Sequence, residues 1–183
     1  LYFAVRDGIR YDPYSASKAA CELAVHSYRK SFFADGPVRV ASARAGNVIG
    51  GGDWAEDRVV PDLARALAAG RPLTLRNPNA VRPWQHVLDP LGGYMLLAES
   101  LARGVNGADS AFNFGPDAAE TRSVREVVET ALKTWPGSWT DASDPKSPAE
   151  AGLLSLTSDK ARAVLGWRPR WNFEPAVRHT IEW

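Results

Sequence analysis

Stretches with a helical spacing of apolar residues alternate along this chain with short apolar stretches. The helical spacing predicts helices at 12–33, 62–69, 90–102, 123–135, 159–165 and 174–183. The short stretches predict strands at 38–45, 73–76 and 111–115, and an extended segment at 81–88. Helices that alternate with short strands favour an α/β fold with a largely parallel sheet.

Several predicted helix ends carry their own signals. Asp12 is a good N-cap, and Pro13 at the first helical position gives up no hydrogen bond. Ser123 with Glu126 three residues later has the capping-box pattern. Gly166 directly follows the helix predicted at 159–165, where a glycine ends many helices.

The composition excludes several classes of protein. The chain has 183 residues, 45% of them apolar and 23% charged, which is typical of a globular domain. With 22 basic and 21 acidic residues the net charge is +1, so there is no electrostatic case for binding nucleic acid or an anionic membrane. No apolar run is long enough to span a bilayer, and the first residues lack the pattern of a signal peptide. We therefore expect a soluble, cytoplasmic protein.

The cysteine and histidine residues give no sign of a disulfide or a metal site. Cys21 is the single cysteine of the chain, and its helical position predicts inert burial against the core. His26, His86 and His179 are far apart and not at ligand spacing from carboxylates, so we expect no metal.

Tyr14 and Lys18 are the first candidates for chemistry. Residues four apart share a helix face, so the Lys18 ammonium would lie beside the Tyr14 phenol. An ammonium favours the phenolate, which can remove a proton from a sugar hydroxyl. The alternative is a tyrosine packed on the helix flank beside a solvated lysine.

The glycine-rich run at 46–52 is a second candidate, because it follows a predicted strand and precedes a helix. This context suits a phosphate loop, but the spacing matches neither dinucleotide nor P-loop patterns. The alternative is a turn in which the backbone closely approaches another segment. Asn47 is the polar side chain at the strand end, where open α/β sheets place ligands.

Arginines form a third set. Arg58, Arg76 and Arg82 have the guanidinium suited to bidentate contact with a diphosphate, although most arginines of such a chain lie on the surface. In the stretch 82–87, Arg82 and Trp84 can enclose a base or sugar ring. The alternative there is an edge strand with a core Trp84 and a structural His86.

The order of these motifs is more specific than any one of them. The sequence resembles the extended short-chain dehydrogenase/reductases that act on nucleotide sugars. The matching motifs are the Tyr14/Lys18 pair, 44–50 (RAGNVIG), 82–89 (RPWQHVLD, with Pro83 in place of the usual acid), 112–115 (FNFG), 159–161 (DKA) and 165–169 (LGWRP). Within the family, the runs at 45–54 (AGNVIGGGDW) and 76–87 (RNPNAVRPWQHV) are most similar to the dehydratases that act on CDP-glucose.

The resemblance implies the C-terminal part of an NAD-binding Rossmann-like fold, interleaved with a small α/β substrate-binding subdomain. Residues 1–50 and 80–118 would belong to the first, and 51–79 and 119–183 to the second. The family's glycine-rich N-terminal half, which holds the NAD pyrophosphate, is not in this sequence, so we expect the activity of the 183 residues alone to be incomplete.

The resemblance also implies an NAD-dependent 4,6-dehydration of CDP-glucose by a homodimer. Tyr14 would take the proton of the glucose 4-hydroxyl, and Lys18 would assist it and hold the nicotinamide ribose. Ala45 and Val48 would lie beside the nicotinamide. The implied substrate contacts are Asn47, Arg58, Leu75, Arg76, Arg82 and Asn113. A 4-epimerase or decarboxylase of nucleotide sugars, and a non-catalytic fragment that only binds a sugar nucleotide, remain open alternatives.

Overall fold

Four short pairs of strands form the framework of the computed structural model, which describes residues 13–144 and 152–183. Three pairs are parallel: β1 (Ser42–Ala45) with β6 (Ala111–Phe114), β2 (Asn47–Ile49) with β5 (Trp84–His86), and β3 (Leu73–Leu75) with β8 (Trp139–Asp141). The fourth pair, β4 (Val81–Arg82) with β7 (Arg122–Ser123), is antiparallel. The predicted α/β fold with mainly parallel pairing is therefore confirmed, in several small sheets.

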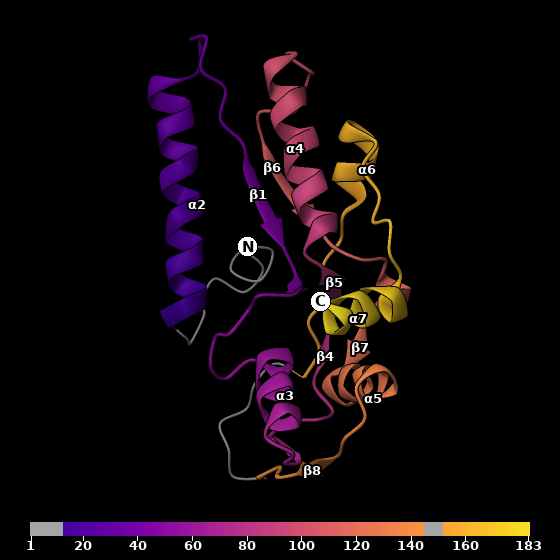
Figure 1. Cartoon of the computed structure of the whole chain (residues 1–183). Helices are drawn as coiled ribbons and strands as arrows, with labels where there is room; N and C mark the ends of the chain where they lie inside the picture. The colour runs from indigo at the N-terminus through magenta and orange to yellow at the C-terminus, as the bar shows by residue number, and fades with distance from the viewer. Residues whose placement is uncertain (1–12, 145–151) are drawn as a thin grey trace.

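One group of elements surrounds the β1–β6 pair. Figure 1 shows α2 (Pro13–Phe32) on one side of these strands and α4 (Leu88–Ala102) and α6 (Asp159–Leu165) on the other. The buried side chains of this group come from α4, β6, α6 and the segment after α6; they are Leu97, Phe112, Phe114, Ala161 and Trp167. No residue of α2 is buried, so this core forms without the longest helix described.

A larger core joins the remaining helices and strands. It is formed by α3 (Val59–Ala68), α5 (Val124–Thr134) and α7 (Phe173–Glu182) around β2, β3 and β5. Its buried members are Ile49, Val60, Leu63, Ala66, Leu73, Leu75, Trp84, Val127, Val128, Ala131, Phe173 and Val177. A short 3₁₀ helix, η1 (Ala118–Glu120), leads into β7.

The end signals read from the sequence operate at two helices. Ser123 accepts the Glu126 N–H while the Glu126 carboxylate accepts the Ser123 N–H, which is the predicted capping box. Gly166 ends α6 with φ 68°, a left-handed conformation that glycine adopts without strain.

Other predictions are corrected by the structure. The strand expected at 38–45 is reduced to Ser42–Ala45, the stretch that pairs with β6. The helix expected at 62–69 begins at Val59, because Pro61 is tolerated in a first turn. Strands β2, β7 and β8 were not predicted, and β2 (Asn47–Ile49) lies within the run that was expected to be a glycine-rich turn. Cys21, expected to be buried, is exposed because α2 buries no residue.

The expected division into two subdomains stays a prediction. Among its boundaries, the assignment of α6 to the second subdomain differs from its packing, since Ala161 and Trp167 lie in the core around β6. In the described part of the chain, no helix combines the length and apolar character needed to span a membrane.

Candidate functional site

Tyr14 and Lys18 lie side by side in the first turns of α2. The Lys18 ammonium is 5.3 Å from the centre of the Tyr14 ring, as their spacing predicts. Tyr14 is 71% exposed, so its phenol is available to a ligand. The two side chains therefore share one face of α2, and the catalytic role itself stays a prediction.

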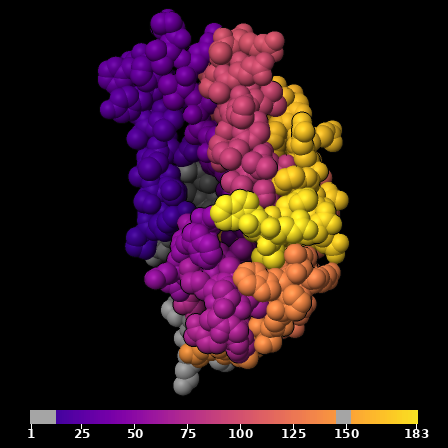
Figure 2. Space-filling model, viewed as in Figure 1, coloured from indigo at the N-terminus to yellow at the C-terminus, as the bar shows by residue number. Residues whose placement is uncertain are grey.

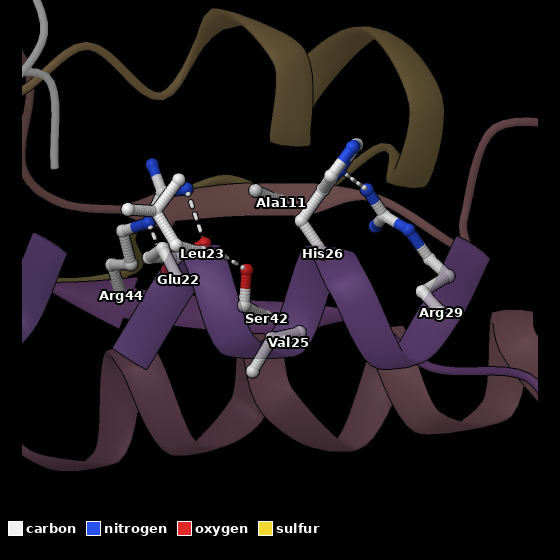
Figure 3. Close-up of a pocket in the computed structure, with 8 residues that line it drawn as sticks. All are labelled: Glu22, Leu23, Val25, His26, Arg29, Ser42, Arg44 and Ala111. Carbon is white, nitrogen blue, oxygen red and sulfur yellow. Dashed lines mark hydrogen bonds and ion pairs between the residues drawn. The ribbon is translucent and has the colours of Figure 1, made fainter. Parts of the chain in front are cut away.

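A network of polar groups that the sequence analysis missed ties α2 to β1. The Glu22 carboxylate accepts hydrogen bonds from Arg44 Nε at 2.7 Å, Arg44 Nη2 at 3.0 Å and Ser42 Oγ at 2.9 Å (Figure 3). The Arg44 guanidinium, opposed by partial burial, holds the pKa of Glu22 below its ordinary value. Glu22 therefore sets the position of the helix that carries Tyr14 relative to the end of β1. This role depends on α2 and β1 lying beside each other in the fold, which the sequence does not show.

A cavity of about 250 Å³ opens between α2 and the β1–β6 pair beside this network. Figure 3 shows its lining residues, which are Glu22, Leu23, Val25, His26, Arg29, Ser42, Arg44 and Ala111. Its charged groups already have partners, since Arg29 donates to the Asp109 carbonyl at 2.8 Å and approaches His26 Nδ1 at 3.3 Å. No predicted site residue is among those that line it.

The predicted ligand-facing residues of the strands lie around the junction of β1 and β2. Ala45 ends β1, and Asn47 and Val48 begin β2; all three are half-buried. On β6, the Asn113 side chain accepts from Arg44 Nη1 at 3.2 Å and donates to the Thr157 carbonyl at 3.2 Å. Both ends of the Asn113 amide thus have protein partners, and its predicted substrate contact would need one of them to be exchanged.

The glycine run is a packing device rather than an open phosphate cradle. A Cβ on Gly50 would lie 2.6 Å from Val87 Cγ1, and a Cβ on Gly51 would overlap the Trp183 indole. Gly52 has φ 77°, which other residues rarely adopt. The alternative of a close backbone approach is therefore the one that fits, and the approached segments are Val87 and Trp183.

Arg58 and Arg76 each pair with an aspartate of the loop that precedes α3. Arg58 Nη1 is 3.2 Å from Asp53 Oδ2, and Arg76 Nη2 is 2.7 Å from Asp57 Oδ1. Both arginine side chains are mostly exposed, so their guanidinium groups remain reachable from solvent. Two of the three arginines singled out in the sequence thus pair with aspartates of the same loop, Asp53 and Asp57.

Two other predicted substrate residues, Arg82 and Leu75, are less exposed than Arg58 and Arg76. Arg82 is half-buried in β4 and donates to the Val81 carbonyl at 2.9 Å. The Leu75 side chain is buried in the larger core, and its carbonyl accepts from the Ala142 N–H at 2.8 Å. The predicted base contact of Leu75 stays a prediction.

The aromatic stretch at 84–86 is structural. Trp84 is buried, and its Nε1 donates to the Arg122 carbonyl at 2.9 Å. His86 is also buried, accepts the Leu88 N–H at Nδ1 and meets the Trp171 ring at 4.4 Å. Burial lowers the pKa of His86, with Asp89 opposing the shift. The structural alternative for both residues is thus the one that fits.

Asp89 of α4 holds the segment between α6 and α7, a role that the sequence analysis did not single out. Its buried carboxylate accepts the Arg170 N–H at 2.8 Å and lies 3.4 Å from the Trp171 N–H, and its carbonyl accepts from Trp167 Nε1 at 3.3 Å.

Among residues 13–144 and 152–183, no group of three His, Cys, Asp or Glu side chains is arranged to hold a metal ion. The expectation of no metal site stays a prediction.

Comparison with known proteins supplies the family. A family model described as the NAD dependent epimerase/dehydratase family matches residues 10–115 of this chain. The chain belongs to this family. The match includes the Tyr14/Lys18 pair, β1, β2 and β6, which are the elements described above.

Individual relatives agree with the family. CDP-glucose 4,6-dehydratase of Salmonella typhimurium is 40% identical over 180 residues, which cover 94% of this chain and 50% of the relative. Two solved structures have the same fold: UDP-glucuronic acid 4-epimerase from Bacillus cereus (TM-score 0.79, 19% identical, 95% of this chain and 52% of that one) and dTDP-glucose 4,6-dehydratase from Bacillus anthracis (TM-score 0.76, 20% identical, 96% and 52%). The expected extended short-chain dehydrogenase/reductase fold is thereby confirmed. The chain spans about half the length of the curated relatives it matches.

Proposed function

We propose that the protein dehydrates CDP-glucose to CDP-4-keto-6-deoxy-glucose with NAD, and that this chain supplies its Tyr–Lys pair and its sugar-nucleotide contacts. The observation that carries the proposal is the exposed Tyr14 phenol with the Lys18 ammonium 5.3 Å from its ring. The 40% identity to CDP-glucose 4,6-dehydratase supports the choice of reaction and base.

The residues present fit one end of NAD. Tyr14 and Lys18 offer a phenol and an ammonium on one helix face, which suit the nicotinamide ribose, whereas the glycine turn is filled by Val87 and Trp183 and does not suit the pyrophosphate. When bound, NAD supplies the acceptor of the sugar's C4 hydride and the donor of the hydride to C6.

The chain's own residues would then orient the sugar nucleotide and move one proton. Tyr14, as the phenolate, takes the proton of the 4-hydroxyl and becomes the neutral phenol, and Lys18 stabilises the phenolate that exists before that transfer. The diphosphate is held by Arg58, Arg82 and Asn113, and the base lies near Arg76 and Leu75. Ala45 and Val48 border the nicotinamide, with Asn47 turned toward the sugar. The 4-ketone acidifies C5, so that water leaves across C5 and C6.

The test uses Tyr14→Phe and a matched variant on the same helix, Tyr28→Phe, whose ring is also exposed. Loss of the phenol should lower turnover of CDP-glucose at least about 100-fold, with NAD retention unchanged. Tyr28→Phe should keep turnover within about twofold. Near-normal product formation by Tyr14→Phe would overturn the role of Tyr14.

A 4-epimerase is the second candidate, because UDP-glucose 4-epimerase of Lacticaseibacillus casei is 28% identical over 88% of this chain. Product analysis separates the two: a dehydratase releases water and gives the 4-keto-6-deoxy sugar, whereas an epimerase returns a sugar of unchanged mass. CDP-galactose as the product would replace our proposal with the epimerase.

We also propose that the protein is a cytoplasmic lyase and that it forms a homodimer through α2. Its product would supply a deoxysugar for bacterial lipopolysaccharide. The exposed apolar side chains Leu23, Tyr28 and Phe32 of α2 support the dimer. Light scattering of the purified protein tests it, since a mass equal to one chain would contradict the dimer.

A further inference from the structure

Trp183 covers the glycine turn that follows β2. A Cβ built on Gly51 would overlap indole atoms Cδ2, Cγ and Cε3, and one on Gly52 would lie 3.4 Å from atom Cη2. Gly51 has no positive φ, so only the indole requires a glycine there. Figure 2 shows the yellow C-terminal end of the chain lying against the purple segment that leads to α3.

The position of Trp183 is fixed by the helix that precedes it. Helix α7 buries Phe173, Ala176, Val177 and Thr180, and its buried face packs against α5, β5 and β2. Thr180 Oγ1 also donates to the Ala176 carbonyl at 2.8 Å. Trp183 follows α7 directly as its C-cap residue, and although the residue is 78% exposed, the packed face of the helix sets the place from which its indole meets the turn.

The turn leads directly to the exposed arginine of the candidate site. Asp53 comes immediately after Gly52; its Oδ1 accepts the Ala55 N–H at 3.1 Å, and its Oδ2 pairs with Arg58 Nη1 at 3.2 Å. Arg65 of α3 holds the far side of the loop through the carbonyls of Trp54 and Ala55, at 2.9 and 3.2 Å. Arg58 is the N-cap residue of α3, so it lies between the loop that Asp53 and Arg65 hold and the first turn of the helix.

We propose that Trp183 is a positioning residue: its indole fixes the Gly50–Gly52 turn and thereby, through Asp53, the guanidinium of Arg58 that contacts the substrate's diphosphate. This inference rests on the proposed function for the identity of the ligand. It also accounts for the glycine run, whose small residues make room for the indole.

The first experiment reads the loop without catalysis. Trypsin cleaves after arginine, and cleavage after Arg58 requires the loop to leave its place. Trp183→Ala should speed cleavage at Arg58 at least fivefold, with cleavage at the exposed Arg103 unchanged. Trp135→Ala, which removes a partly exposed indole far along the chain from the turn, is the matched control and should change neither rate. Equal cleavage at Arg58 in Trp183→Ala and unmodified protein would overturn the proposal.

The second experiment measures KM and kcat, to separate an effect on substrate binding from an effect on the chemical step. In the active enzyme, Trp183→Ala should raise KM for CDP-glucose at least fivefold and leave kcat within twofold, and Trp183→Phe should restore KM because it keeps a flat ring. Gly51→Ala should have the same effect by displacing the indole, and should add nothing in the Trp183→Ala background. An unchanged KM, or a fall in kcat alone, would overturn the positioning role.

The two proposals fail in different ways. If unmodified protein does not turn over CDP-glucose, the proposed function fails and this inference fails with it. If unmodified protein is active while KM and cleavage at Arg58 ignore Trp183, the inference alone is wrong.

Discussion

Helices α2 and α5 differ in how they are held. α2 has 20 residues and buries none of them, whereas α5 has 11 residues and buries Val127, Val128 and Ala131. α5 is held by apolar packing, and α2 by the polar network of Glu22 with β1. The comparison teaches that the site helix depends on a few directed bonds, while the opposite end of the molecule depends on buried area.

The sharpest way to break this comparison is to make the same truncation in both regions. Leu63→Ala in the larger core should lower the free energy of unfolding by about 2–5 kcal/mol, because it leaves a cavity where the side chain is fully buried. At a dilution that keeps the chain monomeric, Leu23→Ala on α2, where the side chain is 71% exposed, should change it by less than about 0.5 kcal/mol. Urea denaturation measures both, and equal losses would contradict the contrast.

The second change removes the polar attachment of α2. Glu22→Gln should cost roughly 1–2 kcal/mol, because it replaces charge-assisted hydrogen bonds to Arg44 and Ser42 with weaker ones. The loss should be local, so hydrogen exchange of α2 amides should rise while α5 amides keep their protection.

The control for that change is Glu99→Gln, which breaks an exposed pair with Arg103 and should have little effect. Because the folded pKa of Glu22 is lowered, its contribution should be present above its ordinary pKa and be lost as pH falls through the folded pKa. Unchanged α2 exchange in Glu22→Gln would show that the helix is held in another way.

The smallest effect is expected from His86, whose pKa is lowered by its burial on the packed side of the molecule. A histidine whose pKa is lowered on folding stabilises the fold above its unfolded pKa, and stability falls as pH drops from there toward the folded pKa. Melting temperature should therefore fall on acidification below about pH 6.5, and less so in His86→Gln. The exposed His26→Gln variant should keep the full dependence, and an identical pH profile for all three proteins would contradict this account.

Local rules predicted the elements and contacts that depend on neighbours in sequence. Ser123 with Glu126 and Gly166 gave two helix ends, and the four-residue spacing gave the contact of Tyr14 with Lys18. Each of these contacts is made within one or two helical turns. Sequence spacing alone is enough to specify them.

Contacts between segments that are distant in the chain could not be predicted from the sequence. The glycine run could be identified as a place of close approach, but the approaching residue, Trp183, lies at the other end of the chain. The exposure of Cys21 and the pairing of Glu22 with Arg44 likewise depend on what packs against α2. Periodicity specifies an apolar face and does not specify whether another segment covers it.

The parallel strand pairs have a consequence for how this protein is made. Residue 42 pairs with 111, and residue 73 with 139, so neither pair can form until a long intervening stretch has left the ribosome. Such non-local pairing slows folding, since loop closure precedes any gain from the contact. Helix α7, synthesised after all of these strands, packs over β2 and β5, so the turn beneath Trp183 acquires its final form only when the C-terminal segment arrives.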